Sequence, residues 1–293
     1  MQTLLKTSAV DSSKKLVVRW WKNAWNLAVP MRGTLFFLHG IGEHAGRYDE
    51  FARAIANWGF DVVSFDYPGH GLSARKGAFE RFADFPEMLS EAHDLYRFWL
   101  MEGPLASAGI SKKPTFLLGH SLGSLLALTW LISDKKPHDL LEGPVKAILS
   151  SPPIGIALKV PAWKDSLAYA LRATIPDLKM GNEITPDILS RDVVKVYEYQ
   201  DDPLRSSKAS PRLYLSLKET MQLVSDKAMN VEVPILVISG KEDQLIDQNV
   251  LKEFYLKLNT HKRWVAFDEM RHEPFNEIGR EKVYEELLKW ILS

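Results

Sequence analysis

The chain has 293 residues and no cysteine, and its 37 basic and 37 acidic side chains give a formal net charge of zero. This composition argues against nucleic acid as a partner and excludes disulfides, cysteine-ligated zinc and a cysteine nucleophile. With 46% hydrophobic residues the chain can bury a large core, which excludes wholesale disorder, and its length suits one large domain or two small ones.

No window of the sequence approaches the roughly 18 consecutive apolar residues of a membrane-spanning helix. Residues 1–15 hold only the apolar pairs Leu4-Leu5 and Ala9-Val10, which are too short for the core of a signal peptide. We therefore expect a cytoplasmic protein, with peripheral membrane contact through an apolar patch as an open alternative.

Strand-like and helix-like segments alternate along the chain. Residues 16–21 alternate in polarity and predict an edge strand. Short apolar runs predict buried strands at 34–38, 60–65, 115–118, 145–149, 235–238 and 263–267. Helical spacing or composition predicts helices over 48–58, 85–100, about 122–132 and 280–292. Such alternation is typical of βαβ units, so we expect an α/β fold with a mostly parallel central sheet flanked by helices on both faces.

Residues 152–231 break this rhythm, because they contain no convincing buried strand and several prolines between short helix-like pieces. A structureless loop of about 80 residues inside a compact domain is implausible. We therefore predict an inserted helical cap, or lid, over 152–231, with the core domain formed by 1–151 and 232–293. The alternative is that these residues form irregular helices of the main domain.

The segment Gly119-His120-Ser121-Leu122-Gly123 is the sole G-x-S-x-G of the sequence and lies between a predicted strand and a predicted helix. In this context the serine sits on a strained turn that exposes its hydroxyl above the sheet, and side chains at 119 and 123 would collide across that turn. We predict Ser121 as a nucleophile. The alternative is a tight turn whose serine caps the helix.

A serine hydroxyl needs a base, and in chains with this turn an acid and then a histidine follow the nucleophile. Three histidines follow Ser121. His138 lies in a polar loop too early for this order, and His261 lies in a polar segment before a strand. His272 follows the last predicted strand, at the edge of the sheet where Ser121 also emerges, so we predict it as the base.

The orienting carboxylate is expected in the loop after strand 235–238. Asp243 lies three residues after Gly240, where its side chain can turn back across the sheet edge. Its task would be to fix the tautomer of the imidazole and to stabilise the imidazolium. Glu242 and Asp247 are the alternatives.

Acyl transfer also needs two backbone N–H donors for the developing oxyanion. We expect one from Leu122, directly after the nucleophile, and one from Ile41 in the glycine-rich turn 39–42. A metal site is disfavoured, because the histidines that could supply it lie in glycine-rich turns without helical i, i+4 pairing. These histidines are His39, His44, His70 and His120.

Longer motifs surround these residues, and the most specific is Gly-Glu-His-Ala-Gly-Arg-Tyr at 42–48. Others are FDYPGHGLS (65–73), LLGHSLGS (117–124), ILSSPP (148–153), LSRD (189–192), YQDDPL (199–204), PILVISGKEDQLI (234–246) and MRHEPFNE (270–277). From about residue 16 to its end, the sequence thereby resembles the α/β-hydrolases of the monoacylglycerol lipase and lysophospholipase family.

This resemblance implies an α/β-hydrolase fold and cleavage of acyl esters of glycerol or glycerophospholipid by a serine triad without a cofactor. It also implies that Glu43, Arg47 and Tyr199 bind the glycerol hydroxyls of a monoglyceride. The chain departs from the family at Ser124, where many members carry glycine, and across most of the cap.

We therefore expect a serine hydrolase that cleaves monoacylglycerols to fatty acid and glycerol. The alternatives are a lysophospholipase, a thioesterase or a broader carboxylesterase, and, outside enzymes, a binding module on a hydrolase scaffold. A peptidase is disfavoured, because no residue is found to anchor a peptide amine. Apolar cap residues are expected either to line an acyl tunnel or to pack within the cap: Ile154, Ile156, Leu158, Val160, Trp163 and Leu167.

Overall fold

The computed structural model of the chain describes residues 1–23, 31–74, 81–103, 112–140, 143–157, 161–182 and 184–293. Among these residues, no helix combines the length and the apolar character that a membrane crossing requires. Leu158 and Val160 of the predicted acyl-tunnel stretch lie outside the described ranges.

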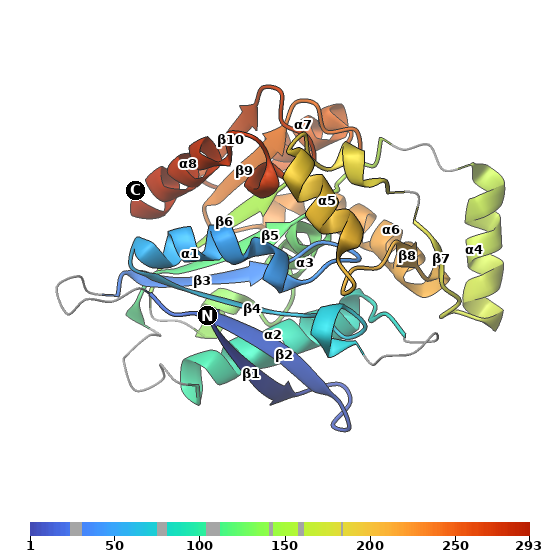
Figure 1. Cartoon of the computed structure of the whole chain (residues 1–293), viewed down its shortest axis with the longest axis horizontal. Coiled ribbons are helices and arrows are strands. Elements are labelled where there is room, and N and C mark those ends of the chain that lie inside the picture. The colour runs from blue at the N-terminus through green and yellow to red at the C-terminus, as the bar shows by residue number, and fades with distance from the viewer. Residues whose placement is uncertain (24–30, 75–80, 104–111, 141–142, 158–160, 183) are drawn as a thin grey trace.

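Across the described ranges, eight strands form one sheet in the order β1-β2-β4-β3-β5-β6-β9-β10 (Figure 1). The strands are β1 (Gln2–Thr7), β2 (Lys15–Trp21), β3 (Gly33–Leu38), β4 (Phe60–Phe65), β5 (Thr115–His120), β6 (Val145–Ser150), β9 (Ile235–Gly240) and β10 (Lys262–Phe267). Strand β2 pairs antiparallel with β1 and β4, and all other neighbours are parallel. The predicted α/β class with a mostly parallel sheet is confirmed.

One strand prediction is wrong. The segment predicted as an edge strand is β2, and it lies inside the sheet because β1 covers its outer side over six residue pairs. Strand β1 is mostly exposed or half-buried. It therefore owes its conformation to backbone hydrogen bonds with β2 rather than to burial of an apolar face, and polarity alone did not indicate it.

Helices cover both faces of the sheet. The helices that pack against it are α1 (Asp49–Asn57), α2 (Phe85–Met101), α3 (Leu122–Leu131), α7 (Gln248–Lys257) and α8 (Arg280–Leu292), together with α6 (Pro211–Asp226) from within residues 152–231. Strand β3 shows the two layers: Leu35 and Phe37 pack in a cluster with α1 and α8, whereas Phe36 and Leu38 pack in the opposite cluster with α2, α3, α6 and α7. Helix α7 was not predicted from the sequence.

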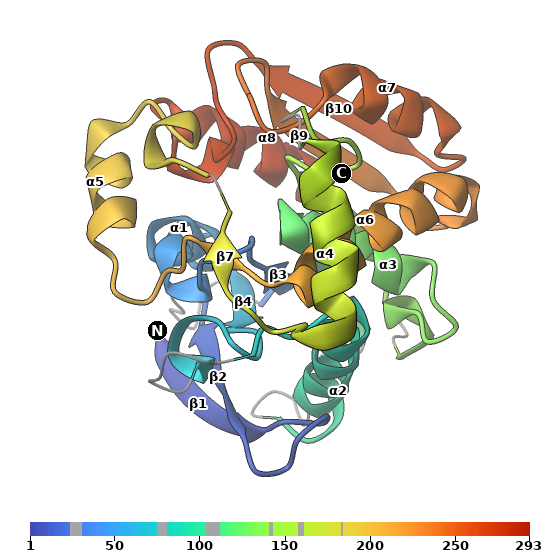
Figure 2. The same ribbon diagram turned by 90° about the vertical axis from the view of Figure 1, so that its right-hand side faces the viewer.

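The remaining elements are short or belong to residues 152–231. They are the helices α4 (Ala162–Thr174) and α5 (Val193–Asp201), the two-residue strands β7 (Met180–Gly181) and β8 (Lys208–Ala209), and 3₁₀ helices at Ala45–Tyr48 (η1), Gly71–Ser73 (η2), Pro137–Leu140 (η5), Pro186–Ile188 (η6), Ala228–Asn230 (η7) and Pro274–Asn276 (η8). Helix α4 lies at the outer end of the molecule, and Figure 2 looks onto it with α5 to one side.

Helix α6 connects this region to the core, since it contacts α4 and also packs against α3 and α2. The buried side chains of Leu213 and Val224 belong to the same cluster as α3. At the start of the region, Ile154 is buried and Ile156 forms an antiparallel bridge with Ile246 of the core. The division into cap and core at residues 152 and 231 stays a prediction.

Candidate active site

Ser121 lies between the end of β5 and the start of α3 with φ 50° and ψ −121°, a conformation that non-glycine residues rarely adopt. The two glycines of the turn allow a very close approach of strand and helix. A Cβ atom on Gly119 would lie 2.2 Å from the carbonyl oxygen of Gly123, and one on Gly123 would lie 2.0 Å from that of Leu38. The strained turn expected from the motif is therefore present, and its glycines are required sterically.

The structure brings the three predicted triad residues together. The Nε2 atom of His272 lies 2.9 Å from Oγ of Ser121, and its Nδ1 atom lies 2.9 Å from Oδ2 of Asp243. Since the ionised carboxylate can only accept, Nδ1–H donates to Asp243 and Nε2 is left to accept the proton of the serine hydroxyl. The side chains of His272 and Asp243 are 5% and 0% exposed, so little water competes for these hydrogen bonds.

Burial opposes the charged form of His272, but the adjacent Asp243 carboxylate outweighs it and raises the pKa of His272 above its ordinary value. Burial likewise acts to raise the pKa of Asp243, but the imidazole and the N–H groups of Leu245 and Ile246 outweigh it and hold that pKa below its usual range. The acid thus stays ionised while the imidazole accepts a proton, which is the charge pattern that general-base catalysis needs.

The alternative candidates lie elsewhere. Glu242 is exposed, and Asp247 accepts two N–H groups from the first turn of α7. Nε2 of His138 lies 3.4 Å from Oε2 of Glu232, and His261 stacks on the ring of Trp290 with a centroid separation of 5.3 Å. None of these four side chains is hydrogen-bonded to Ser121 or His272.

The turn after β3 holds the second predicted oxyanion donor. The N–H group of Gly40 is committed to Oε1 of Glu43, so the next N–H along the turn, that of Ile41, is the better placed to serve a ligand. The N–H group of Leu122 belongs to the first turn of α3, where helical N–H groups lack an acceptor within the helix. The assignment of these two N–H groups as oxyanion donors stays a prediction.

Ser124, where the sequence departs from the family, has a structural role. Its buried hydroxyl lies 2.6 Å from the carbonyl oxygen of Gly119 and 2.9 Å from that of Ser150, so its one proton is shared between these two acceptors. It therefore ties the start of α3 to β5 and β6 beneath the turn. Ser151 has a similar role for the loop that carries His272, because its hydroxyl donates to the carbonyl oxygen of His272 at 2.8 Å.

Glu43, Arg47 and Tyr199 lie together, as the resemblance implied. Arg47 donates to Glu43, and its guanidinium carbon lies 4.4 Å from the centre of the Tyr199 ring. Sequence reasoning missed the fourth member of this cluster: Nη1 and Nη2 of Arg47 each donate to one oxygen of Glu273 at 2.8 Å. The available signal was a carboxylate immediately after the predicted base.

Two carboxylates thus share one guanidinium in a buried place. Burial raises the pKa of Glu43 despite its pairing with Arg47. Burial also acts to raise the pKa of Glu273, but the bidentate contact with Arg47 outweighs it and lowers that pKa. The cluster carries surplus negative charge beside His272, which favours the protonated imidazole.

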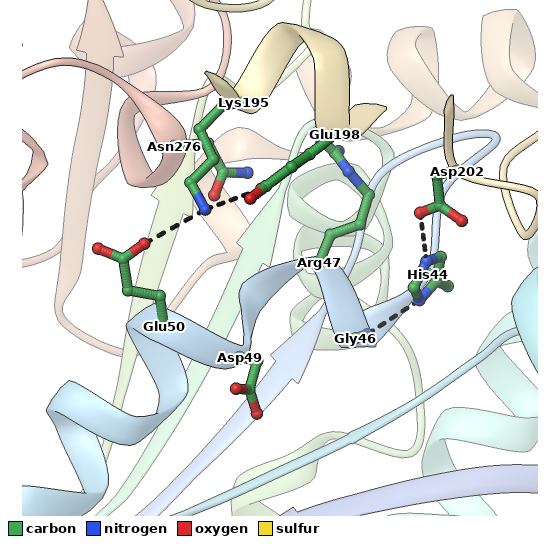
Figure 3. Close-up of a pocket in the computed structure, with 9 residues that line it drawn as sticks. All are labelled: His44, Gly46, Arg47, Asp49, Glu50, Lys195, Glu198, Asp202 and Asn276. Carbon is green, nitrogen blue, oxygen red and sulfur yellow. Dashed lines mark hydrogen bonds and ion pairs between the residues drawn. The ribbon is translucent and has the colours of Figure 1, made fainter. Parts of the chain in front are cut away.

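Residues 193–206 contact the oxyanion turn from outside. Nε2 of His44 lies 2.7 Å from Oδ2 of Asp202, and the N–H group of Ser206 donates to the carbonyl oxygen of Gly42 at 2.7 Å. A polar pocket of about 310 Å³ lies between η1, α1 and α5 (Figure 3). Its lining comprises His44, Gly46, Arg47, Asp49, Glu50, Lys195, Glu198, Asp202 and Asn276.

The other histidines near the turn are buried. Burial lowers the pKa of His70 to about 4 and that of His120 to about 3, and it holds the pKa of His39 well below its ordinary value. Within the described part of the chain, no three side chains of the metal-ligating types are grouped to hold an ion.

A strained serine lies between a parallel strand and a helix and is hydrogen-bonded to a histidine, which is in turn hydrogen-bonded to an aspartate, both from later strand ends. This arrangement defines an α/β-hydrolase. A profile of the family described as "Serine aminopeptidase, S33" matches residues 29–279. The chain belongs to this family of α/β-hydrolases and is a lipolytic carboxylic ester hydrolase that is similar to monoacylglycerol lipases.

Several relatives match over most of the chain. Phospholipase YtpA of Bacillus subtilis is 29% identical, covering 89% of this chain and 95% of its own length. Monoglyceride lipase of Homo sapiens is 28% identical over 94% of this chain and 86% of its own length. An uncharacterized abhydrolase domain-containing protein of Dictyostelium discoideum is 29% identical over 91% of this chain, which spans 27% of that protein. The crystal structure of Paleococcus ferrophilus monoacylglycerol lipase has a TM-score of 0.75 at 26% identity, covering 94% of this chain and 98% of that one.

Replacing Asp243 by asparagine should lower kcat on a soluble aryl ester by up to about 10⁴, because the imidazole then loses its orienting acceptor. Steady-state kinetics on the purified variant measure this. The exposed neighbour supplies a matched control, Glu242→Gln, which should keep the activity. A near-normal D243N variant, or a comparable loss in E242Q, would assign the acid role elsewhere.

The pH dependence of kcat/KM should report the raised pKa of His272. The base must be neutral to accept the serine proton, so activity should fall as pH drops through this pKa. The acid-limb midpoint is therefore expected above the ordinary histidine value of 6.5. A midpoint at or below 6.5 in the intact enzyme would contradict the stabilisation of the imidazolium by Asp243.

Proposed function

We propose that the protein hydrolyses monoacylglycerols to a free fatty acid and glycerol through an acyl-enzyme intermediate. The observation that carries the proposal is the hydrogen-bonded series Ser121–His272–Asp243 on a strained turn. The similarity to named monoglyceride lipases over most of the chain supports the choice of substrate.

In the proposed reaction, Oγ of Ser121 attacks the ester carbonyl carbon while Nε2 of His272 takes the hydroxyl proton. The N–H groups of Ile41 and Leu122 stabilise the oxyanion. When the tetrahedral intermediate breaks down, His272 gives its proton to the departing glycerol oxygen. A water molecule then attacks the acyl-enzyme by the same route, its proton passing to His272 and on to Ser121, and the fatty acid leaves. The chain's own groups move every proton, so no cofactor is required.

The glycerol end of the substrate is proposed to lie against Glu43, Arg47 and Tyr199. Arg47 belongs both to this cluster and to the lining of the polar pocket beneath α5. A polar pocket is suited to the hydroxyl groups of glycerol, whereas an acyl chain needs apolar surroundings.

A second substrate class is favoured by the similarity to a bacterial phospholipase, which makes a lysophospholipid the alternative to a monoglyceride. The family description names an aminopeptidase, but an aminopeptidase needs a carboxylate to hold the substrate ammonium. The two buried glutamates nearest the base, Glu43 and Glu273, are both paired with Arg47. This pairing disfavours peptide substrates.

Peripheral contact of the cap with a lipid surface is also proposed. Along and just after α4, large apolar side chains face solvent: Trp163 is 63% exposed, Tyr169 56%, Ile175 50% and Leu167 37%. Such a concentration of exposed apolar groups on one helix is typical of a surface that meets lipid or another apolar partner. The cytoplasmic location stays a prediction from the sequence.

Ser121→Ala should abolish hydrolysis of monoacylglycerols and of soluble aryl esters while leaving the fold intact. The measurement is fatty acid release from a panel of monoglycerides of several chain lengths, lysophosphatidylcholine and an acyl thioester, with circular dichroism as the folding control. Highest kcat/KM on a monoglyceride is the expected result. Unchanged turnover in S121A would refute the serine mechanism. A preference for lysophosphatidylcholine would replace monoacylglycerol by lysophospholipid as the proposed substrate.

The double substitution Trp163→Ala with Tyr169→Ala should reduce the fraction of protein that sediments with phosphatidylcholine vesicles, because each ring adds apolar surface to the contact. Leu256→Ala is the matched control, since Leu256 is 65% exposed on α7 and not on α4. Equal sedimentation of the double variant and the wild type would refute contact through α4.

A further inference from the structure

A chain of buried charged groups joins the oxyanion turn to the loop that carries the base. Glu43 lies in the turn, Glu273 directly follows His272, and Arg47 donates to both. The side chain of Glu43 is 3% exposed, that of Glu273 4% and that of Arg47 8%. Ion pairs that are shielded from water in this way hold their geometry far more firmly than surface pairs do.

On the turn side, Glu43 acts as an internal acceptor. Its Oε1 atom accepts the N–H group of Gly40 and, at 2.8 Å, the hydroxyl of Tyr48, while Oε2 accepts from Arg47. This hydrogen bond fixes the peptide between His39 and Gly40. The next peptide bears the Ile41 N–H, and its carbonyl oxygen, on Gly40, lies 2.8 Å from Nδ1 of His39. Because a glycine-rich turn has little stiffness of its own, we expect loss of the Glu43 acceptor to loosen this turn and displace the Ile41 N–H.

On the base side, Glu273 is fixed from several directions. Arg47 binds both of its oxygens, Nδ2 of Asn276 donates to Oε2 at 2.9 Å, and its backbone N–H donates to the carbonyl oxygen of Leu189 at 2.9 Å. The backbone of His272 is attached to this fixed point by one peptide bond. Arg47 therefore bridges the two halves of the catalytic machinery.

We propose that Glu43 and Glu273 are positioning residues which, through Arg47, hold the Ile41 N–H and the His272 imidazole in register for ester cleavage. The proposal rests on the proposed serine chemistry and extends it. It is additional to the proposed contact with the glycerol end, because it acts through the hydrogen bonds that Glu43 makes within the protein. A positioning role acts on every ester, including one without glycerol.

The test compares two butyryl esters, monobutyrin and p-nitrophenyl butyrate, which share the acyl group and differ in the alcohol. The variants are Glu43→Gln, Glu273→Gln and the double variant. Complete loss of an oxyanion donor costs about 10²–10³ in kcat, and displacing one is expected to cost at least about tenfold. Both single variants should therefore lose kcat on both esters, with a smaller change in KM.

Because Arg47 connects Glu43 to Glu273, the effects of the two single substitutions on kcat should not be independent. Since either substitution breaks the same connection, the double variant should be little slower than the slower single variant. Glu219→Gln, which removes a carboxylate from the exposed ion pair with Arg172, is the control and should retain full activity. Thermal unfolding monitors the fold, and if E43Q is unfolded, kcat of E273Q on p-nitrophenyl butyrate decides alone.

Two results would overturn the proposal. Normal kcat on p-nitrophenyl butyrate with a raised KM for monobutyrin would show that the cluster serves the glycerol end only. Multiplicative losses in the double variant would show two independent sites. A wild type that cleaves p-nitrophenyl butyrate through Ser121 but not monobutyrin would end the monoglyceride proposal, and the aryl ester would still test the bridge.

Discussion

The hydrogen bond between His272 and Ser121 is the contact on which the proposed chemistry depends. It joins residues 151 positions apart, so the fold must bring them together. Strands β5, β6 and β9 are adjacent and parallel, and β10 is parallel to β9. Their carboxyl ends therefore meet at one edge, where Ser121, Asp243 and the His272 loop follow β5, β9 and β10 in turn. An antiparallel order at any of these pairings would place one partner at the opposite edge.

The carboxylates around this contact all act in one direction. Asp243, Glu43 and Glu273 lie near the imidazole with Arg47 as the cation between the two glutamates, and each carboxylate favours a protonated His272. Burial keeps the neighbouring His120 neutral by lowering its pKa to about 3, so it adds no opposing positive charge. In a site that excludes water, such fixed charges act on the transition state without having to reorganise.

Much of the fold and site was predictable because its signals are local. Buried parallel strands are continuous apolar runs, and the turn at Ser121 needs glycines at fixed positions, so both are visible in a few adjacent residues. Strand β1 was not predictable in this way, because its partner's backbone determines its conformation. The pairing of Arg47 with Glu273 spans 226 positions and was equally hidden, since a lone carboxylate in a loop has no local pattern. The exposure of Trp163 also depends on where α4 lies rather than on its sequence.

The oxyanion turn is held from two sides, and this explains why its motif extends well beyond two glycines. From within, Glu43 accepts the Gly40 N–H; from outside, Asp202 contacts His44 and the Ser206 N–H donates to Gly42. Tyr199, on the same segment 193–206, stacks on Arg47, which also binds Glu273 beside the base. The position of this segment is thus tied by direct contacts to the turn after β3 and, through Arg47, to the loop that carries His272. Because these contacts join residues that are far apart in the sequence, the segment and the turn cannot vary independently at this junction.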